Sequence, residues 1–327
     1  MHSCQICNSK KIHILKDFKK QNLCNRYLKK TNYREFKYPL ILSQCYQCGL
    51  IQLKKTVPSK QIAQKFSWLK YYEPEDHLNK LANIVKKLPL PQHPTLCGIT
   101  YKDDSLLKRL KLSKFKSAWR IKPKEDLGIT IPTVAGETII PKLTDKNLKK
   151  LIKKYKKVDF LVARHVLEHA PNTEKFMNSM KRLLNPNGYL LFEVPDCSTQ
   201  LKYFDYTMLW EEHTLYFTLD IFKNYFKYYY TKLKFYKFLN YRYPIENALV
   251  VILKNSKNDL QSKRKNILNA GNLNIGKRYG KNFNTKKNMI NKKLAYFKKK
   301  YGKIAIYGAG HISTMFINLM GIKKYIS

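Results

Sequence analysis

Four of the seven cysteines stand in two pairs that share one spacing, Cys4-Gln5-Ile6-Cys7 and Cys45-Tyr46-Gln47-Cys48. Two such pairs supply the four sulfur ligands of a tetrahedral Zn²⁺ site, and Gly49 follows the second pair as a knuckle turn requires. Disulfide-bonded or unrelated cysteines are the alternative. A shell of four thiolates has no open position, so the spacing predicts a structural zinc site that stabilises a small domain and performs no chemistry.

Two histidine-containing stretches are the other places where side chains could do chemistry. Residues 163–172 read ARHVLEHAPN and residues 210–217 read WEEHTLYF. The first is expected at the carboxyl end of a strand, which is the edge where open α/β sheets bind ligands. An unperturbed imidazole has a pKa of ~6.5 and is suited to removing a proton near neutral pH. Taken alone, these histidines are also consistent with a helix N-terminus and with the surface.

Short apolar runs that alternate with helical stretches must position these residues. From Thr95 onward the runs are TLCGIT, SAWRI, VDFLVAR, GYLLFEV, KLKFYKFL and NALVVILK, and they predict six strands. Apolar residues recur at helical spacing through TEKFMNSMKRLL, so its methionines are expected in the core. Thr218 is expected to cap the next helix, with Asp220 in its first turn. The alternation predicts an α/β fold with a parallel sheet and crossover helices.

The pattern divides the 327 residues into four parts. Residues 1–57 are the predicted zinc-binding module, residues 58–94 a linker with an amphipathic helix, and residues 95–255 the sheet domain. Residues 256–327 begin with a Lys- and Asn-rich helical stretch and end in KIAIYGAGHIST, a strand, Gly-rich turn and helix of nucleotide-binding type. Because the sequence stops six residues after Gly321, we expect this last unit to be truncated, completed by another subunit, or marginal.

In chain order, the cysteine pairs, HVLEH, EVPD, EEH with its aromatic run, and YGAG resemble the three-domain sugar C-methyltransferases, which act on nucleotide-linked ketosugars. The resemblance runs from Cys4 to about Leu319. It implies a class I methyltransferase sheet of Rossmann-like type, flanked by an N-terminal zinc-binding module and a partial C-terminal Rossmann-like unit. The implied cofactors are S-adenosyl-L-methionine and a structural Zn²⁺, and the implied substrate is a nucleotide-linked (keto)deoxysugar.

Methylation at a sugar carbon requires removal of a proton next to a ketone, stabilisation of the enolate oxygen, and an in-line sulfonium methyl. The resemblance implies that His213 is the base, that Glu212 contacts the substrate, and that Trp210 lies beside the reacting atoms. The other implied residues form two groups. The cofactor-binding group is Thr100, Asp103, Asp104, Lys122, Arg164 and His165, and the substrate group is Tyr72, His77 and Glu193. For the residues of the linker helix, packing is the alternative.

Two departures from the family pattern affect the cofactor. Thr100 and Asp104 stand at glycine positions of the first sheet loop, and loss of glycine removes freedom to adopt positive φ and to let a cofactor approach the backbone. At the end of the second strand, Lys122 replaces an acid that accepts from the ribose hydroxyls. Glu125 or Asp126 is the expected substitute.

Two further departures affect the substrate. Trp210 replaces a tyrosine, which exchanges a phenol for an indole that only donates a hydrogen bond. The C-terminal unit, which in the family helps to hold the nucleotide half of the substrate, keeps only a first strand and the turn Gly308-Ala309-Gly310. We therefore expect substrate affinity to suffer more than methyl transfer.

The composition is strongly basic, since 64 Lys and Arg against 22 Asp and Glu give a formal charge of +42. These residues are mostly dispersed lysines, whereas proteins that read phosphates favour clustered arginines, so no specific nucleic-acid partner is expected. A zinc-containing nucleic-acid binder is the alternative from that class. The diffuse positive field suits an anionic nucleotide-linked substrate. No stretch is long and apolar enough for a membrane span and no signal peptide is recognisable, so we expect a cytoplasmic protein.

Two alternatives stand beside the sugar C-methyltransferase hypothesis. An O- or N-methyltransferase of a related substrate would use His213 to deprotonate a hydroxyl or an amine. A non-catalytic member that binds a nucleotide sugar or a protein partner is suggested by Thr100, Lys122 and the early stop.

Overall fold

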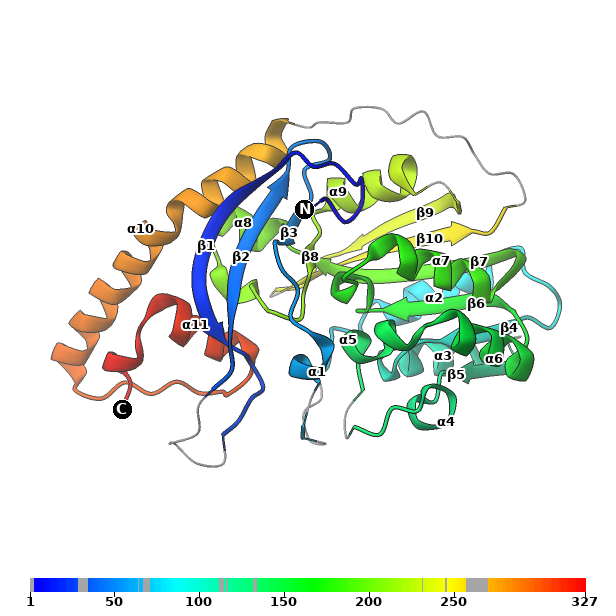
Figure 1. The fold of residues 1–327 in the computed structure, drawn as a ribbon, viewed down its shortest axis with the longest axis horizontal. Coiled ribbons are helices and arrows are strands. Elements are labelled where there is room, and N and C mark those ends of the chain that lie inside the picture. The colour runs from blue at the N-terminus through cyan, green and yellow to red at the C-terminus, as the bar shows by residue number, and fades with distance from the viewer. Residues whose placement is uncertain are drawn as a thin grey trace.

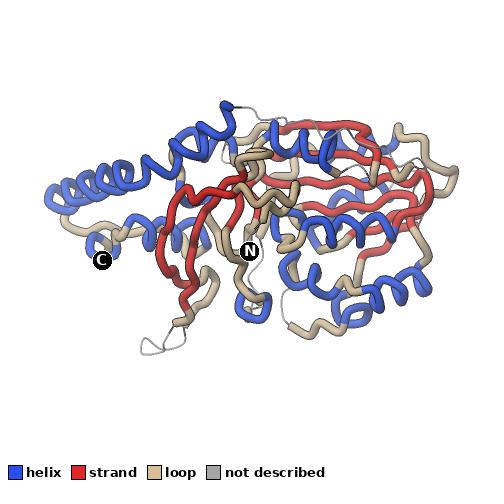
Figure 2. Tube along the Cα trace, turned by 45° about the horizontal axis from the view of Figure 1, so that its top comes forward, coloured by secondary structure: helices blue, strands red, loops and turns tan. Residues whose placement is uncertain are grey.

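Two β-sheets form the framework of the chain, and Figure 1 shows them side by side. The structure is a computed structural model, and it describes residues 3–28, 35–63, 65–66, 71–111, 115, 117–131, 134–230, 232–244, 246–256 and 270–327. Residues 64 and 67–70 of the expected linker lie outside this range. The helices that cover the sheets are drawn in blue in Figure 2.

The larger sheet has six strands in the order β5-β4-β6-β7-β10-β9. The strands are β4 (Thr95–Gly98), β5 (Ser117–Arg120), β6 (Val158–Arg164), β7 (Leu184–Asp196), β9 (Lys234–Tyr241) and β10 (Asn247–Lys254). All six predicted apolar runs contribute a strand, and the predicted class I methyltransferase sheet is confirmed. The first four strands are parallel, but β10 is antiparallel to β7 and β9. The short connection between β9 and β10 makes a hairpin, which reverses the chain direction.

Helices cover both faces of this sheet, and alternate residues of the central strands face them. On β6, Phe160 and Val162 join one hydrophobic cluster, while Leu161 and Ala163 join the other. The first face is covered by α2 (Leu78–Lys86) and α3 (Asp104–Lys111), and the second by α6 (Asp145–Tyr155), α7 (Thr173–Leu183) and α9 (Leu219–Asn224). With both faces covered, the carboxyl ends of the parallel strands are the expected place for a site.

Shorter helices complete the connections of the fold. They are α1 (Ser59–Ile62), α4 (Pro123–Leu127), α5 (Gly136–Ile139) and α8 (Ser198–Tyr203). Thr218 occupies the N-cap of α9 and Asp220 its first turn, as predicted, although the Thr218 hydroxyl makes no capping hydrogen bond. Met177 and Met180 of α7 are fully buried, as helical spacing predicted.

The smaller sheet joins the cysteine-containing module to the larger domain. Its antiparallel strands are β1 (Ile12–Asn22), β2 (Lys37–Cys45), β3 (Ile51–Leu53) and β8 (Leu215–Tyr216), in that order. Strand β8 directly follows the candidate base His213 and Thr214, and the Leu53 N–H donates to the Thr214 oxygen over 3.0 Å. Backbone hydrogen bonds therefore connect the module to the segment that carries the base.

The C-terminal helices α10 (Ala270–Tyr301) and α11 (His311–Met320) pack on the smaller sheet (Figure 1). Tyr279, Phe283 and Met315 share a hydrophobic cluster with Phe18 and Leu42 of that sheet. The predicted domain boundaries at residues 57, 94 and 255 stay a prediction. This hydrophobic cluster joins residues of the predicted N-terminal module to residues of the predicted C-terminal segment.

The predicted C-terminal strand is absent: among the described residues, 303–308 form no strand. A strand requires a hydrogen-bonded neighbour along its length. Here the Ser327 N–H donates to the Ile304 oxygen over 3.0 Å, and the Lys303 N–H donates to the nearby Tyr301 oxygen over 3.1 Å.

The loop after β4 adopts ordinary backbone angles without its two glycines. Thr100 has φ −125° and Asp104 has φ −57°, so neither occupies the left-handed region. The predicted cost of losing positive φ is therefore absent. Gly98 is the glycine that this loop requires, because a Cβ there would approach the Asp103 Cβ and the Leu107 Cδ1 to 2.9 Å.

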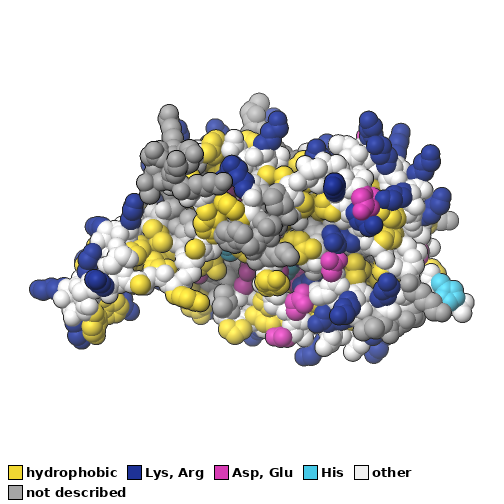
Figure 3. All heavy atoms as spheres, turned by 90° about the horizontal axis from the view of Figure 1, so that it is seen from below, with side chains coloured by type: hydrophobic (Ala, Val, Ile, Leu, Met, Phe, Trp, Pro, Cys, Tyr) yellow, Lys and Arg dark blue, Asp and Glu magenta, His cyan; other side chains and the backbone are white. Residues whose placement is uncertain are grey.

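The basic residues are dispersed on the face drawn in Figure 3, where Lys and Arg side chains surround a few acidic ones without forming one patch. Its charge is diffuse there, as the sequence predicts. Among the helices of the described residues, none is both long enough and apolar enough to cross a membrane.

Candidate active site and zinc centre

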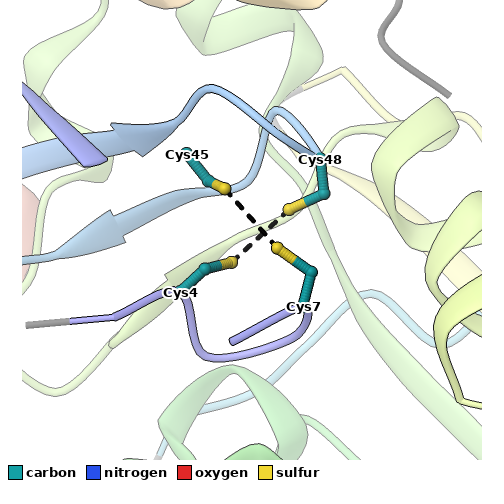
Figure 4. Close-up of side chains that lie close together, drawn as sticks. All are labelled: Cys4, Cys7, Cys45 and Cys48. Atoms are coloured by element: carbon teal, nitrogen blue, oxygen red, sulfur yellow. Dashed lines mark hydrogen bonds between the residues drawn. The ribbon is translucent and has the colours of Figure 1, made fainter. Parts of the chain in front are cut away.

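The four cysteines of the two pairs converge on one point, as Figure 4 shows. The Sγ atoms of Cys4 and Cys48 are 3.4 Å apart, those of Cys7 and Cys45 are 3.5 Å apart, and all four lie within 4.8 Å of one another. All four are free thiols. Zn–S bonds of ~2.3 Å in a tetrahedron place sulfurs ~3.8 Å apart, so a structural Zn²⁺ fits this cluster.

The turn that follows Cys45 is closed by its backbone. The Gly49 N–H donates to the Cys45 oxygen over 3.0 Å, and the Cys45 N–H donates to the Leu50 oxygen over 2.9 Å. Gly49 has φ +80°, a region that favours glycine. The knuckle turn predicted from the sequence therefore depends on Gly49.

His213 lies on the wall of a cavity of about 420 Å³ at the carboxyl edge of the larger sheet. The lining comes from the linker, the β6–β7 edge, the turn before β8 and the start of α11. It includes Tyr71, Tyr72, His165, Trp210, His213 and His311. Burial, together with the neighbouring His169 and His311, holds the pKa of His213 well below its ordinary value, so its ring is neutral at neutral pH.

Thr214 fixes the turn that carries His213 against the HVLEH turn. Its N–H donates to the Glu168 oxygen over 2.8 Å. Its hydroxyl lies 3.0 Å from the same oxygen and 2.9 Å from the Ala170 oxygen. The rings of His213 and His169 consequently meet edge to face, with centroids 4.8 Å apart.

Trp210 connects the cavity to the C-terminal helix. Its ring stacks on His311 with centroids 4.3 Å apart and an interplanar angle of 8°, and it meets Tyr71 edge-on at 5.1 Å. Its buried Nε1–H has no acceptor within the described part of the chain. The donor that the sequence predicts at this position is therefore available to a ligand.

Arg164 and Glu193 form a buried ion pair beneath the cavity. The Arg164 Nε and Nη2 donate to the two Glu193 oxygens over 2.7 and 3.2 Å, and both side chains are fully buried. His77 Nε2 lies 3.2 Å from Glu193 Oε2, and its Nδ1 lies 2.6 Å from the Tyr243 hydroxyl. Burial opposes ionisation, but Arg164 and His165 hold the pKa of Glu193 well below its ordinary value.

His165 extends this network to the cavity wall. Its Nε2 lies 3.1 Å from Glu193 Oε1, and its Nδ1 lies 3.6 Å from Glu168 and 3.9 Å from Glu73. Burial disfavours the charged ring, but the charges of these carboxylates raise the pKa of His165 to about 10. Glu73 also pairs with Lys102. We therefore refer to Arg164, His165, Glu193 and His77 as the paired network.

The three predicted substrate residues lie in two different places in the structure. Tyr72 lines the cavity and is 88% exposed. His77 and Glu193 are buried in the paired network and do not line that cavity. Their contacts with Arg164 and His165 position the cavity wall.

Asp103 shapes the cofactor loop from beneath. Its carboxylate accepts from the N–H groups of Ile99 (2.7 Å), Thr100 (2.8 Å) and Arg164 (2.8 Å). Burial raises the pKa of Asp103 to about 6. Because three backbone donors occupy its carboxylate, Asp103 fixes the shape of this loop. Asp104 is more exposed, and its Oδ1 accepts from the Arg120 Nε over 2.8 Å.

The carboxyl end of β5 offers Glu125 as an acceptor for ribose hydroxyls. Lys122 is exposed, and its Nζ lies 3.1 Å from Glu125 Oε2. Asp126 is already engaged, because it accepts from the Lys122 N–H over 2.8 Å and from the Lys154 Nζ over 2.7 Å. Of the two substitutes that the sequence suggests, Glu125 is thus the exposed one. Glu125 is the residue at this end of β5 that would hold the ribose hydroxyls of S-adenosylmethionine.

A second buried cluster lies beside His213, and Glu212 is its one member among the predicted site residues. Its members Glu137, His169 and Glu212 bring three ligand-type atoms within 4.8 Å of one another, and Glu168, His169 and His213 form a similar group. Burial raises the pKa of Glu137 to about 7 and lowers the pKa of His169 to about 4. HVLEH contains two of these residues, but nothing in the sequence marked Glu137, whose burial depends on tertiary contacts.

Two family models match the sequence. Residues 4–62 match a "Putative zinc binding domain" and residues 94–229 match a "Methyltransferase domain". These ranges contain the four cysteines and the carboxyl edge that carries Gly98, His165 and His213. No curated protein matches the sequence of this chain.

Solved structures similar to this chain include methyltransferases. N-methyltransferase NodS from Bradyrhizobium japonicum is 11% identical, with a TM-score of 0.33 over 56% of this chain and 100% of that one. YcgJ from Bacillus subtilis is 8% identical, with a TM-score of 0.35 over 56% and 99%. The two family models, the larger sheet and the cysteine cluster together identify the domains of this chain. The chain is accordingly a methyltransferase that uses S-adenosylmethionine, with a class I methyltransferase domain and an N-terminal zinc-binding domain.

Proposed function

We propose that this methyltransferase transfers a methyl group to a carbon of a nucleotide-linked ketodeoxysugar, with His213 as the base. The observation that carries the proposal is the position of His213 on the cavity wall, beside Trp210 and within the edge of the sheet where class I domains bind their ligands. The neutral ring of His213 can accept a proton from a carbon next to a ketone.

The side chains around His213 match the needs of an enolate. Once the proton moves to His213, the electron pair of the C–H bond passes into the enolate, whose oxygen gains negative charge. The Trp210 Nε1–H, which has no acceptor among the described residues, is a donor for that oxygen. Glu212, predicted to contact the substrate, is buried and does not line the cavity. S-adenosylmethionine, when bound, supplies an electrophilic methyl group that the enolate carbon attacks, and S-adenosylhomocysteine leaves.

The position of two residues at the start of α11 supports the proposal that the substrate is large. His311 and Ile312 line the cavity, so the C-terminal segment contributes to the same cavity as the linker residue Tyr72. We propose that this segment contacts the nucleotide half of the substrate in the diffuse positive field of the chain. The seven cysteines are free thiols, which is consistent with the reducing cytoplasm that we propose as the location.

The test follows two atoms, the proton that His213 removes and the methyl carbon. Zinc-loaded protein is incubated with ¹³C-methyl S-adenosylmethionine and a panel of nucleotide-linked ketosugars, and NMR locates the label. Exchange of the carbon-bound proton is measured separately in D₂O. We expect His213→Ala to lower both rates by ~10²–10⁴-fold. The matched control is His93→Ala, because His93 is exposed and lies outside the cavity lining.

The outcomes separate the alternatives. A methyl shift typical of carbon attachment, together with exchange that depends on His213, supports the proposal. A methyl shift typical of oxygen or nitrogen, without carbon exchange, identifies an O- or N-methyltransferase instead. Full activity of His213→Ala would exclude His213 as the base.

A further inference from the structure

We propose that Glu137, His169 and Glu212 form a binding site for a divalent transition-metal cation, which we call the carboxylate–histidine site. The three residues offer two carboxylates and one imidazole, with ligand atoms within 4.8 Å of one another. His169 Nδ1 lies 3.9 Å from Glu137 Oε2. The inference goes beyond the proposed function and does not depend on it, since cation binding is measured without substrate.

Three separate segments bring the ligands together, and each segment is held by its backbone. Glu137 lies on α5, where Gly136 packs against the HVLEH turn, because a Cβ at Gly136 would lie 3.3 Å from both His169 Cδ2 and Val166 Cα. His169 closes that turn with an N–H that donates to the Val166 oxygen over 3.1 Å. Glu212 precedes Thr214, whose contacts with the HVLEH turn fix its position. The site is therefore built into the fold.

The ligand atoms are buried and have few hydrogen-bond partners among the described residues. Glu137 is 3% exposed, and within the described part of the chain neither of its carboxylate oxygens has a hydrogen bond. His169 is 5% exposed, and its Nδ1 likewise has no hydrogen bond there. Glu212 is 3% exposed, with one long contact of 3.5 Å from the Asn25 Nδ2. Unsatisfied buried polar groups are costly and rare in folded proteins, so these atoms point to a missing ligand.

Charge identifies the class of that ligand. A neutral sugar hydroxyl would satisfy the hydrogen bonds of protonated carboxyls, whereas a cation is the ligand that would stabilise both carboxyls in their ionised forms. The nearby protein cations are already engaged, because Lys102 pairs with Glu73 and Arg164 pairs with Glu193. A divalent cation would compensate both carboxylates of Glu137 and Glu212 and use the lone pair of His169.

The donor set selects the metal. Carboxylate oxygen with imidazole nitrogen suits Mn²⁺, Fe²⁺ or Zn²⁺, whereas the four thiolates of the cysteine cluster select a softer or borderline ion such as Zn²⁺. Mn²⁺ therefore distinguishes the two sites, since it binds oxygen and nitrogen ligands and competes poorly with Zn²⁺ for thiolates. A bound cation would draw the three groups closer together and would lie beside His213.

The experiment titrates zinc-loaded full-length protein with Mn²⁺ alone, followed by electron paramagnetic resonance and calorimetry. We expect one Mn²⁺ per chain, and at least a tenfold loss of affinity in Glu137→Gln and in His169→Asn. Glu211→Gln is the matched control, because Glu211 neighbours Glu212 and is buried, but accepts from the Cys24 N–H over 2.6 Å. Its Mn²⁺ affinity should equal that of the wild type.

A spectroscopic signature keeps the test independent of variant stability. Pulsed electron paramagnetic resonance of Mn²⁺ on the wild-type protein should show ¹⁴N coupling from a single imidazole. Thermal unfolding and zinc content establish that each variant is folded. Absence of stoichiometric Mn²⁺ binding, absence of the ¹⁴N coupling, or equal affinity in wild type and folded Glu137→Gln overturns the proposal.

Discussion

Two buried polar clusters contain residues of the HVLEH turn, and they differ in whether their charged groups have hydrogen-bond partners. In the paired network, Arg164 gives Glu193 two hydrogen bonds, and His77 and His165 complete its shell. In the carboxylate–histidine site, both oxygens of Glu137 and the Nδ1 of His169 have no hydrogen-bond partner among the residues that the structure describes. Both clusters are buried and contain glutamate and histidine, but only the paired network contains an arginine.

This difference distinguishes charged groups that stabilise the fold from charged groups that are available to bind a ligand. A buried ion whose hydrogen bonds are satisfied within the fold stabilises the arrangement around it, and removal of its partner is costly. A buried carboxylate without a partner lowers stability until something binds. The cysteine cluster is the extreme case, because four sulfurs in mutual contact need a cation from outside the chain.

Removal of zinc is expected to have the largest effect. Structural Zn²⁺ contributes on the order of 10–16 kcal/mol in small modules, so Cys45→Ser should lose the metal and the order of β1 to β3. Because β3 pairs with β8, hydrogen exchange should also rise at Leu215 and Tyr216. Cys24→Ala is the control, since Cys24 lies outside the cluster. Unchanged exchange in β8 would show that the module is not coupled to the site.

Substitution of Arg164 tests the paired network. Arg164→Met leaves Glu193 buried without its main counter-charge, and we expect unfolding free energy to fall by about 3–5 kcal/mol. Chemical denaturation measures the change. Adding Glu193→Gln to Arg164→Met should recover part of the loss, because the unpaired charge is then removed. A loss below about 1 kcal/mol would contradict the assigned role of the pair.

The pH dependence of stability reports on His165. Its pKa is raised from the ordinary value of ~6.5 to about 10, so the charged ring favours the folded state. The stability that it contributes is fully present below pH ~6.5 and is lost as pH rises through about 10. Wild type should therefore exceed His165→Gln by on the order of a few kcal/mol at pH 6, and the difference should shrink steadily toward pH 10. A constant difference would place His165 outside the network.

The smallest effect is expected in the carboxylate–histidine site. Without added Mn²⁺, Glu137→Gln removes a buried carboxylate that has no partner, so stability should stay unchanged or rise by about 1 kcal/mol. The measurement is the same denaturation as for Arg164→Met, at the same pH. If Glu137→Gln lowered the free energy of unfolding as much as Arg164→Met does, Glu137 would be a residue that stabilises the fold.

Local sequence patterns predicted most of the fold. The repeated cysteine spacing and Gly49 define the zinc centre, and apolar runs of strand length define all six strands of the larger sheet. These signals are readable because each depends on residues close in sequence. The direction of β10 and the absence of a strand at 303–308 depend on pairing partners, which periodicity does not reveal.

The sequence by itself determined the ligand set of the zinc centre, the α/β class of the fold and the position of HVLEH at the end of β6. Only the tertiary structure decided that β8 joins the module, that Asp103 is occupied by backbone donors, and that Glu137 meets His169 and Glu212. The physical reason is burial. Whether a carboxylate is paired, exposed or held without a partner depends on segments far apart in the chain, and their contacts exist only once it folds.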